Sequence, residues 1–156
     1  MTSPSASRER RRLAAEAKAT LRELRIELAL LNHRISGLAR LRDVDLDCLD
    51  VLVRQGSMTP TELARRTGVH PATLTGVLAR LETAGWLVRA RGEHDRRSVE
   101  LCPVPERVRE IFGHYAGMNA ALDQILDDYS AEDLGVIVDF LQKSSAAGRR
   151  ETEALD

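Results

Sequence analysis

The sequence predicts a mainly helical protein with one small β-ribbon, in which two short helices lie between longer helices at either end. Three observations support this fold class. Apolar residues recur every three or four positions through most of the 156 residues. Helix start and stop signals divide residues 59–85 into two short helices. Two short segments typical of strands, residues 86–91 and 96–102, follow with Gly92 between them.

The composition is that of a globular protein. A chain of 156 residues is about one domain long, and 43% hydrophobic residues suffice for a core. The longest apolar runs fall far below the roughly 18 residues that span a bilayer, and the N-terminus is polar and basic. We therefore expect a cytoplasmic protein that is not bound to a membrane, with reduced thiols at Cys48 and Cys102.

Residues 1–7 predict a disordered N-terminus, and residues 8–42 predict a long helix for dimerisation. The apolar residues of this helix follow the alternating three and four spacing of a heptad seam. They are Leu21, Leu24, Leu28, Leu31, Ile35 and Leu38. A second copy of the chain would bury this stripe economically, so we expect a homodimer. The alternative is packing against the chain's own C-terminal helices, and both arrangements are compatible.

Residues 43–102 are expected to form a compact lobe. Its first helix is predicted over residues 42–56. The next helix has a complete start signal, Thr59-Pro60-Thr61-Glu62, and ends at Gly68. A third helix begins at Pro71, and the order of helix, short glycine turn and helix is a helix-turn-helix motif.

The second helix of such a motif presents its N-terminal side chains to base edges in the major groove. The candidates here are His70, Ala72, Thr73, Thr75 and Gly76. Threonine offers a hydroxyl and a methyl group, whereas the bidentate readers Arg, Asn and Gln are absent from this turn, so direct base discrimination should be modest. Phosphate contacts are an equally good role for the threonines. Arg80, further along the helix, is placed for a phosphate or for holding the ribbon.

The ribbon is expected to have an apolar side and a basic tip. The residues expected to face the core are Val88, Val99 and Leu101. The tip carries Asp95, Arg96 and Arg97, and an arginine on a slim hairpin fits the narrow minor groove. Residues 54–97 contain eight Lys and Arg against four Asp and Glu, whereas residues 98–156 contain five against twelve. The positive charge therefore coincides with the motif and the ribbon, which indicates a nucleic-acid partner.

Residues 103–156 are expected to supply C-terminal dimerisation helices and a tail. One helix is predicted from Pro105 to about Asp128, continuing through Gly113 and Gly117. A capping-box-like sequence at Ser130 starts the last helix, which is expected to fray in the polar tail.

Three segments together resemble the MarR family of bacterial winged-helix regulators. They are Leu63-Ala64-x3-Gly68-Val69, Leu78-x2-Leu81-Glu82-x2-Gly85-Trp86-Leu87-Val88-Arg89 and Asp95-Arg96-Arg97-Ser98-Val99-x-Leu101. The resemblance covers the layout of residues 20–142. It implies a winged helix-turn-helix domain that binds double-stranded DNA as a homodimer, on a near-palindromic operator. It also implies repression that is relieved by a small aromatic or phenolic ligand, an oxidant or a metal, with Asp95 and Arg97 as the wing pair.

Two positions depart from the family pattern. Gly76 stands where many relatives have arginine, and His70 stands where a small hydroxyl residue usually caps the helix. The resemblance places an effector pocket between the dimer helices and the DNA-binding lobe. Candidates for it are His33, Phe112 and Tyr115, although each also suits a core position.

Other function classes find little support in the sequence. The four histidines have no catalytic partner at a known spacing, and there is no phosphate-binding glycine loop, so we expect neither an enzyme nor a bound cofactor or metal. A redox- or metal-responsive repressor of the same fold is one alternative, although neither Cys48 nor Cys102 has a clear activating environment. A winged helix used only for protein contact is another.

Overall fold

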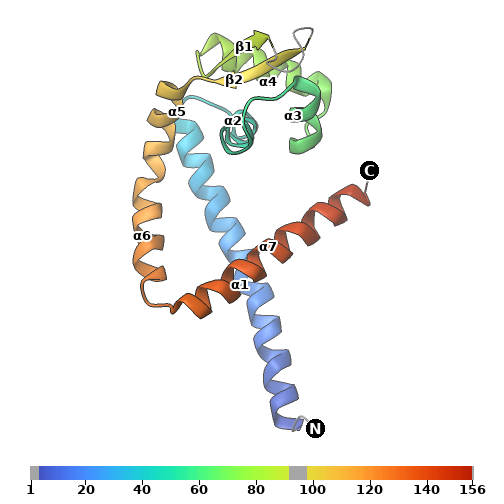
Figure 1. Ribbon diagram of the computed structural model, residues 1–156, viewed down its shortest axis with the longest axis vertical. Helices are drawn as coiled ribbons and strands as arrows, with labels where there is room; N and C mark the ends of the chain where they lie inside the picture. Colours follow the sequence, from blue (N-terminus) through green and yellow to red (C-terminus); the bar gives the residue numbers. More distant parts are fainter. Residues whose placement is uncertain (1–3, 92–97, 156) are drawn as a thin grey trace. The chain divides into compact units, whose positions relative to one another are not determined.

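The computed structural model describes residues 4–91 and 98–155, and its internal contacts divide the chain into two compact units, residues 1–111 and 112–156 (Figure 1). The first unit has α1 (Pro4–Leu38), α2 (Asp43–Gln55), α3 (Pro60–Thr67), α4 (Pro71–Thr83), β1 (Leu87–Arg91), β2 (Val99–Pro103) and nearly all of α5 (Pro105–Phe112). The second has a 3-10 turn (Gly113–Tyr115), α6 (Ala116–Leu126) and α7 (Ala131–Glu153). This confirms the predicted fold class, a mainly helical protein with one small ribbon.

The N-terminal helix is longer than the sequence predicts. α1 begins at Pro4, so the expectation of disorder is wrong for residues 4–7. Proline is well suited to the first turn of a helix, and Arg12 forms ion pairs with Glu9 and Glu16 at 2.8 and 2.9 Å. These local interactions favour a helix even where the side chains are exposed.

The apolar seam of α1 divides into two parts. Leu24 and Leu28 are 42% and 39% exposed, whereas Ile35 is only 2% exposed. Ile35 lies near the end of α1 that is adjacent to α2, and it belongs to the core of the chain. The C-terminal end of the seam, at Ile35, therefore packs within the chain, while Leu24 and Leu28 remain at the surface.

Local capping determines the limits of the helix-turn-helix. The Thr59 hydroxyl accepts the backbone N–H of Glu62 at 3.2 Å, which confirms the predicted start of α3. Gly68 ends α3 with φ of +67°, a left-handed conformation that favours glycine. Figure 1 shows α2, α3 and α4 gathered with the ribbon at one end of α1, so these caps orient the helices that support the ribbon.

The register of the ribbon corrects the prediction of which residues face the core. In the antiparallel pair, Leu87 is opposite Pro103 and Arg89 is opposite Leu101, so Leu87 and Leu101 share one face. Leu87 and Leu101 are 1% and 0% exposed, whereas Val88 is 52% exposed. The expectation for Leu101 is confirmed. That for Val88 is wrong because alternation places Val88 on the opposite face from its buried neighbour.

Val99 is likewise more exposed than predicted, at 44%. It is opposite Arg91 at the far end of the ribbon, two residues before Leu101 and on the same face. Residues of a strand that extend past the helices stay uncovered, whichever face they occupy. The paired strands are therefore buried at Leu87 and Leu101 and exposed at Arg91 and Val99.

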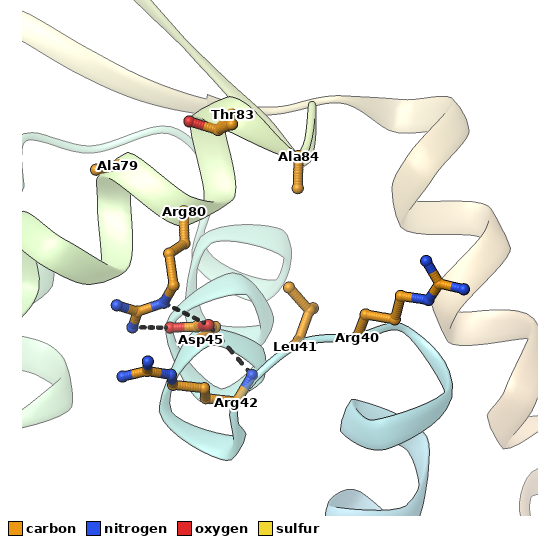
Figure 2. A pocket seen from close by; sticks show the side chains of 8 residues that line it. All are labelled: Arg40, Leu41, Arg42, Asp45, Ala79, Arg80, Thr83 and Ala84. Carbon is orange, nitrogen blue, oxygen red and sulfur yellow. Dashed lines mark hydrogen bonds and ion pairs between the residues drawn. The ribbon is translucent and has the colours of Figure 1, made fainter.

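Side chains from α2, α3, α4 and the ribbon, with Ile35 of α1 and Ile111 of α5, form the core of the first unit. The largest fully buried ones are Trp86, Leu46, Leu49, Leu52, Leu63, Leu81, Leu87, Leu101 and Ile111. A charged residue lies among them: Asp45 on α2 is 1% exposed, and its carboxylate binds Arg80 of α4 through Nε and Nη2 at 3.0 and 2.6 Å (Figure 2). The same carboxylate accepts the backbone N–H of Arg42 at 3.2 Å. One buried group thus joins the start of α2 to α4.

In the second unit, the predicted continuous helix is interrupted. α5 ends at Phe112, a 3-10 turn covers Gly113–Tyr115, and α6 then begins at Ala116. Glycine is a poor helix former, and Gly113 lies where the prediction required the helix to continue.

The last helix begins at Ser130 with the predicted capping box, in which Ser130 accepts the Asp133 N–H at 3.1 Å. Within the described ranges, no helix is both long and apolar enough to cross a membrane.

Removing the cation from the buried pair should destabilise the fold. In Arg80→Met, the carboxylate of Asp45 stays buried without its guanidinium, and we expect the free energy of unfolding to fall by about 3 kcal/mol. The double variant Asp45→Leu/Arg80→Met should recover much of that loss because it removes the unpaired charge as well. Urea denaturation followed by circular dichroism measures both.

The matched control is Arg89→Met, which breaks a partly exposed pair with Glu82 and should cost less than about 1 kcal/mol. A loss in Arg80→Met no larger than in this control would contradict a structural role for the Asp45 pair.

Candidate nucleic-acid interface

The N-terminal turn of α4 forms the exposed surface of the helix-turn-helix. His70 is the N-cap, and its Nδ1 accepts the backbone N–H of Ala72 at 3.3 Å, as a hydroxyl oxygen would at this position. Pro71 occupies the first helical position. Ala72, Thr73 and Thr75 are exposed, while Leu74, Val77 and Leu78 are buried. The buried face fixes the helix to the lobe and turns the small residues outward.

This exposed turn has a limited hydrogen-bonding capacity. The Thr75 hydroxyl donates to the carbonyl of Pro71 at 3.1 Å, which leaves its oxygen lone pairs and its methyl group for a ligand. The Thr73 side chain is exposed, so its hydroxyl is open to solvent. A methyl group added to Gly76 would meet Arg80 Nη1 at 3.5 Å, an ordinary contact, so space alone does not require glycine there. The turn therefore offers small groups that permit a close approach to a groove floor.

The Arg80 side chain passes beside Gly76, and its guanidinium forms the bidentate pair with Asp45. Among the described residues of the ribbon, none is bonded to it. The predicted role in holding the ribbon belongs instead to Arg89, whose Nε lies 2.7 Å from the Glu82 carboxylate of α4. Arg80 already has an anionic partner within the protein, and its predicted phosphate contact stays a prediction.

The sequence reasoning missed this Arg89 link and the exposed Arg91. Both lie in β1 and, by the register, on the face that also carries Leu101. The alternation of arginines at positions 89 and 91 beside the buried Leu87 was the available signal. Asp95, Arg96 and Arg97, the predicted tip residues, lie outside the described residues.

The residues predicted for an effector pocket occur in both units. In the first unit, His33 Nδ1 lies 2.9 Å from the carboxylate of Asp43, at the start of α2. The buried Ser36 hydroxyl donates to the same carboxylate. Both hydrogen bonds lower the pKa of Asp43, and the one from Ser36 has the larger effect. In the second unit, Phe112 and Tyr115 stack with ring centroids 5.7 Å apart. The proposed pocket stays a prediction.

The cysteines differ in their surroundings. Cys48 is fully buried, and burial raises the pKa of its thiol to about 11, although a hydrogen bond with Thr67 opposes this shift. Cys102 is partly exposed on β2, and both are free thiols. Among the described residues there is no group of three or more His, Cys, Asp or Glu side chains that could hold a metal ion.

Comparisons with known proteins agree with this geometry. Residues 41–99 match the sequence profile of the MarR family. The matched segment contains the whole helix-turn-helix and ends in the ribbon. Over 151 residues it is 27% identical to YcgE of Bacillus subtilis, an uncharacterised HTH-type transcriptional regulator, and the match covers 97% of this chain and 98% of YcgE.

Two further similarities concern parts of the chain. Over 88 residues it is 34% identical to the HTH-type transcriptional repressor YetL of Bacillus subtilis, covering 54% of this chain and 50% of YetL. The crystal structure of NadR in complex with 4-hydroxyphenylacetate superimposes with a TM-score of 0.62 and 26% identity, covering 80% of this chain and 89% of NadR. By these similarities the chain is a DNA-binding transcription regulator of the helix-turn-helix type and not an enzyme.

Burial should make Cys48 unreactive in the folded protein. At pH 8 a thiol with a pKa of about 11 is almost entirely protonated, and the side chain has no exposed surface. We expect iodoacetamide to modify Cys102 well before Cys48, and to modify both in 8 M urea, as measured by peptide mass spectrometry. Equal labelling of the two thiols in the native protein would contradict this assignment and would restore Cys48 as a candidate redox sensor.

Proposed function

We propose that this protein is a regulator of the MarR type, a homodimeric repressor that binds a near-palindromic operator and is released by a small aromatic or phenolic ligand. The observation that carries the proposal is the exposed N-terminal turn of α4, held by the His70 cap and by the buried Leu74 and Val77. A rigid helix with small exposed residues at its N-terminus is suited to entry into a major groove. Because its target is bacterial DNA, we propose that the protein acts in the cytoplasm.

The proposed DNA contacts combine this turn with the wing. In the turn they are His70, Ala72, Thr73, Thr75 and Gly76. In the wing they are Asp95, Arg96 and Arg97, with the arginines in the minor groove. Strand β1, at the base of the wing, is joined to α4 by the ion pair of Arg89 and Glu82. The turn and the wing would therefore belong to one rigid lobe, proposed as residues 43–102.

Exposed apolar surface supports a dimer. Leu24 and Leu28 of α1 remain exposed in the first unit. In the second unit, described by itself, α6 and α7 contain no buried residue and carry large exposed apolar side chains, among them Leu122, Ile125 and Phe140. Apolar surface of this extent is typical of an interface. We therefore propose that residues 8–42 and 103–156 form the dimerisation region.

The similarity to YetL supports repression, and the NadR complex supports a phenolic effector. For that effector, His33, Phe112 and Tyr115 remain candidate contacts.

Operator binding should depend on the wing and on salt. With the tightest fragment selected from the source genome, Arg97→Ala should weaken binding roughly tenfold and reduce the slope of log K against log salt by about 1. Lys143→Ala, which removes an exposed cation paired with Asp139 in the second unit, is the control and should change neither quantity. Fluorescence anisotropy at several salt concentrations measures both. Wild-type binding that does not change with salt would favour the protein-contact alternative.

The seam should control assembly. Sedimentation of the wild type at micromolar concentration is expected to give twice the chain mass of 17.3 kDa. Leu24→Glu/Leu28→Glu should shift the protein towards monomer because it places charges in an apolar interface. Val88→Glu, at a somewhat more exposed apolar residue of the ribbon, should leave the mass unchanged. A monomeric wild type would refute the dimer.

A further inference from the structure

The N-terminal part of α4 presents mostly apolar groups. From Pro71 to Ala79 the helix contains no charged and no amide side chain. The exposed residues of its first turn include Ala72, Thr73 and Thr75. The bidentate hydrogen bonds with which arginine, asparagine and glutamine distinguish bases are therefore not available here. The groups left for reading a base are methyl groups and the threonine hydroxyls.

The Thr75 side chain is already held in place. Its hydroxyl donates to the carbonyl of Pro71 at 3.1 Å, so its proton is not available to a base acceptor. Because the hydroxyl and the methyl group are both bonded to Cβ, a hydroxyl held against the backbone fixes the methyl group as well. Thr75 therefore offers DNA a methyl group in a defined position, which reduces the entropy lost on binding.

A hollow of about 190 Å³ lies beside Thr75, between α3 and α4 of the first unit. The residues that line it are uncharged, among them Thr61 and Ala64 of α3 and Pro71 of α4. Its volume is below the roughly 300 Å³ at which sites for drug-sized ligands begin. The hollow is continuous with the exposed turn, because Pro71 and Thr75 belong to both. An apolar group that projects from bound DNA fits this hollow better than a separate ligand does.

The major groove offers one such group. The 5-methyl group of thymine is the apolar feature of the base edges there, whereas the other features are hydrogen-bond donors and acceptors. Covering one methyl group corresponds to roughly a fourfold gain in affinity. Gly76 adds no side chain that would hold the helix away from the bases. The chemistry of the turn is therefore complementary to thymine.

We propose that the N-terminal turn of α4 reads its operator through the 5-methyl groups of thymines. The hollow between α3 and α4 takes one methyl group beside Thr75, and Ala72 and the methyl group of Thr73 contact others. The inference rests on the proposed function, because it requires this turn to enter the major groove. Contacts of the wing in the minor groove are independent of it, since the 5-methyl group projects into the major groove.

Replacing thymine by deoxyuridine tests the inference, because it removes the methyl group and keeps the hydrogen-bonding groups of the base pair. The probe is the tightest fragment selected from the source genome, with deoxyuridine at every thymine of both half-sites. Fluorescence anisotropy of the full chain should show binding weakened by roughly tenfold or more, because contacts are lost in both half-sites. A second probe carries 5-bromodeoxyuridine, whose bromine is close in size to a methyl group, and should bind like the thymine operator.

A random duplex with the same replacements is the control for general effects of deoxyuridine on DNA. Its affinity should be the same with thymine and with deoxyuridine.

Two matched variants separate the methyl groups from the hydroxyls. Thr73→Ser/Thr75→Ser keeps the hydroxyls and removes the methyl groups, so the ratio of affinities for the thymine and deoxyuridine operators should fall to about threefold or less. Thr73→Val/Thr75→Val replaces the hydroxyls and keeps the methyl groups, and should retain the wild-type ratio. Arg97→Ala should weaken binding to both operators by the same factor. The melting temperature of each variant confirms that it is folded.

Four results would overturn the inference and leave the proposed function intact. These are equal affinity of the wild type for the thymine and deoxyuridine operators, an equal loss for the random duplex, a serine variant with the wild-type ratio, and a valine variant that loses the ratio as the serine variant does. The last result would assign the reading to the hydroxyls. Absence of any DNA binding at low salt would refute the proposed function and this inference together.

Discussion

The buried pair of Asp45 and Arg80 is the interaction on which the geometry of the lobe depends. Its partners come from α2 and α4, which are separated by α3 and a tight turn, and the carboxylate also accepts a backbone N–H at the start of α2. Apolar packing between helices tolerates small rotations, whereas two parallel hydrogen bonds to a guanidinium permit few. Such a pair need not add net stability over apolar residues, but it gives α4 a defined rotation about its axis. That rotation decides which residues of α4 face outward.

The surface that results is suited to close approach more than to detailed reading. The first turn of α4 exposes two threonines and an alanine, and one threonine hydroxyl is already donated to the backbone. Two arginines that could add contacts to DNA form ion pairs within the protein instead: Arg80 with Asp45, and Arg89 with Glu82. These two guanidinium groups are thus paired within the lobe. In the proposed function, the arginines of the wing supply the positive charge for DNA and read groove shape, while the helix contacts base edges.

The α1 helix packs against the lobe near its C-terminal end and exposes an apolar stripe earlier in its length. Near its C-terminal end Ile35 and Ser36 are buried, and Ser36 and His33 both bind Asp43 at the start of α2. Earlier in the helix, leucines at heptad spacing stay exposed. A helix that is rigid across both parts can transmit a change at one end to the other, because it has few internal degrees of freedom. In the loop that follows, Arg40 adopts a left-handed φ of +56°, and the Leu41 N–H closes the end of α1 by donating to the Ser36 carbonyl at 2.8 Å.

The sequence by itself determined the local elements. Thr59, Gly68 and Pro71 act through hydrogen bonds and backbone conformations within a few residues, so the helix limits of the motif were readable, and the apolar periodicity located most of the core. The tertiary structure alone decided the partner of Arg80, since Asp45 lies 35 residues away and many carboxylates were equally available in sequence. It likewise decided that Leu87 and not Val88 faces inward, because a shift of one residue exchanges the two faces of a strand. Tertiary structure alone also decided the surface cavity lined by Arg40, Arg42 and the C-terminal end of α4. Its residues come from segments that share no local signal, and the packing of α2 against α4 brings them together.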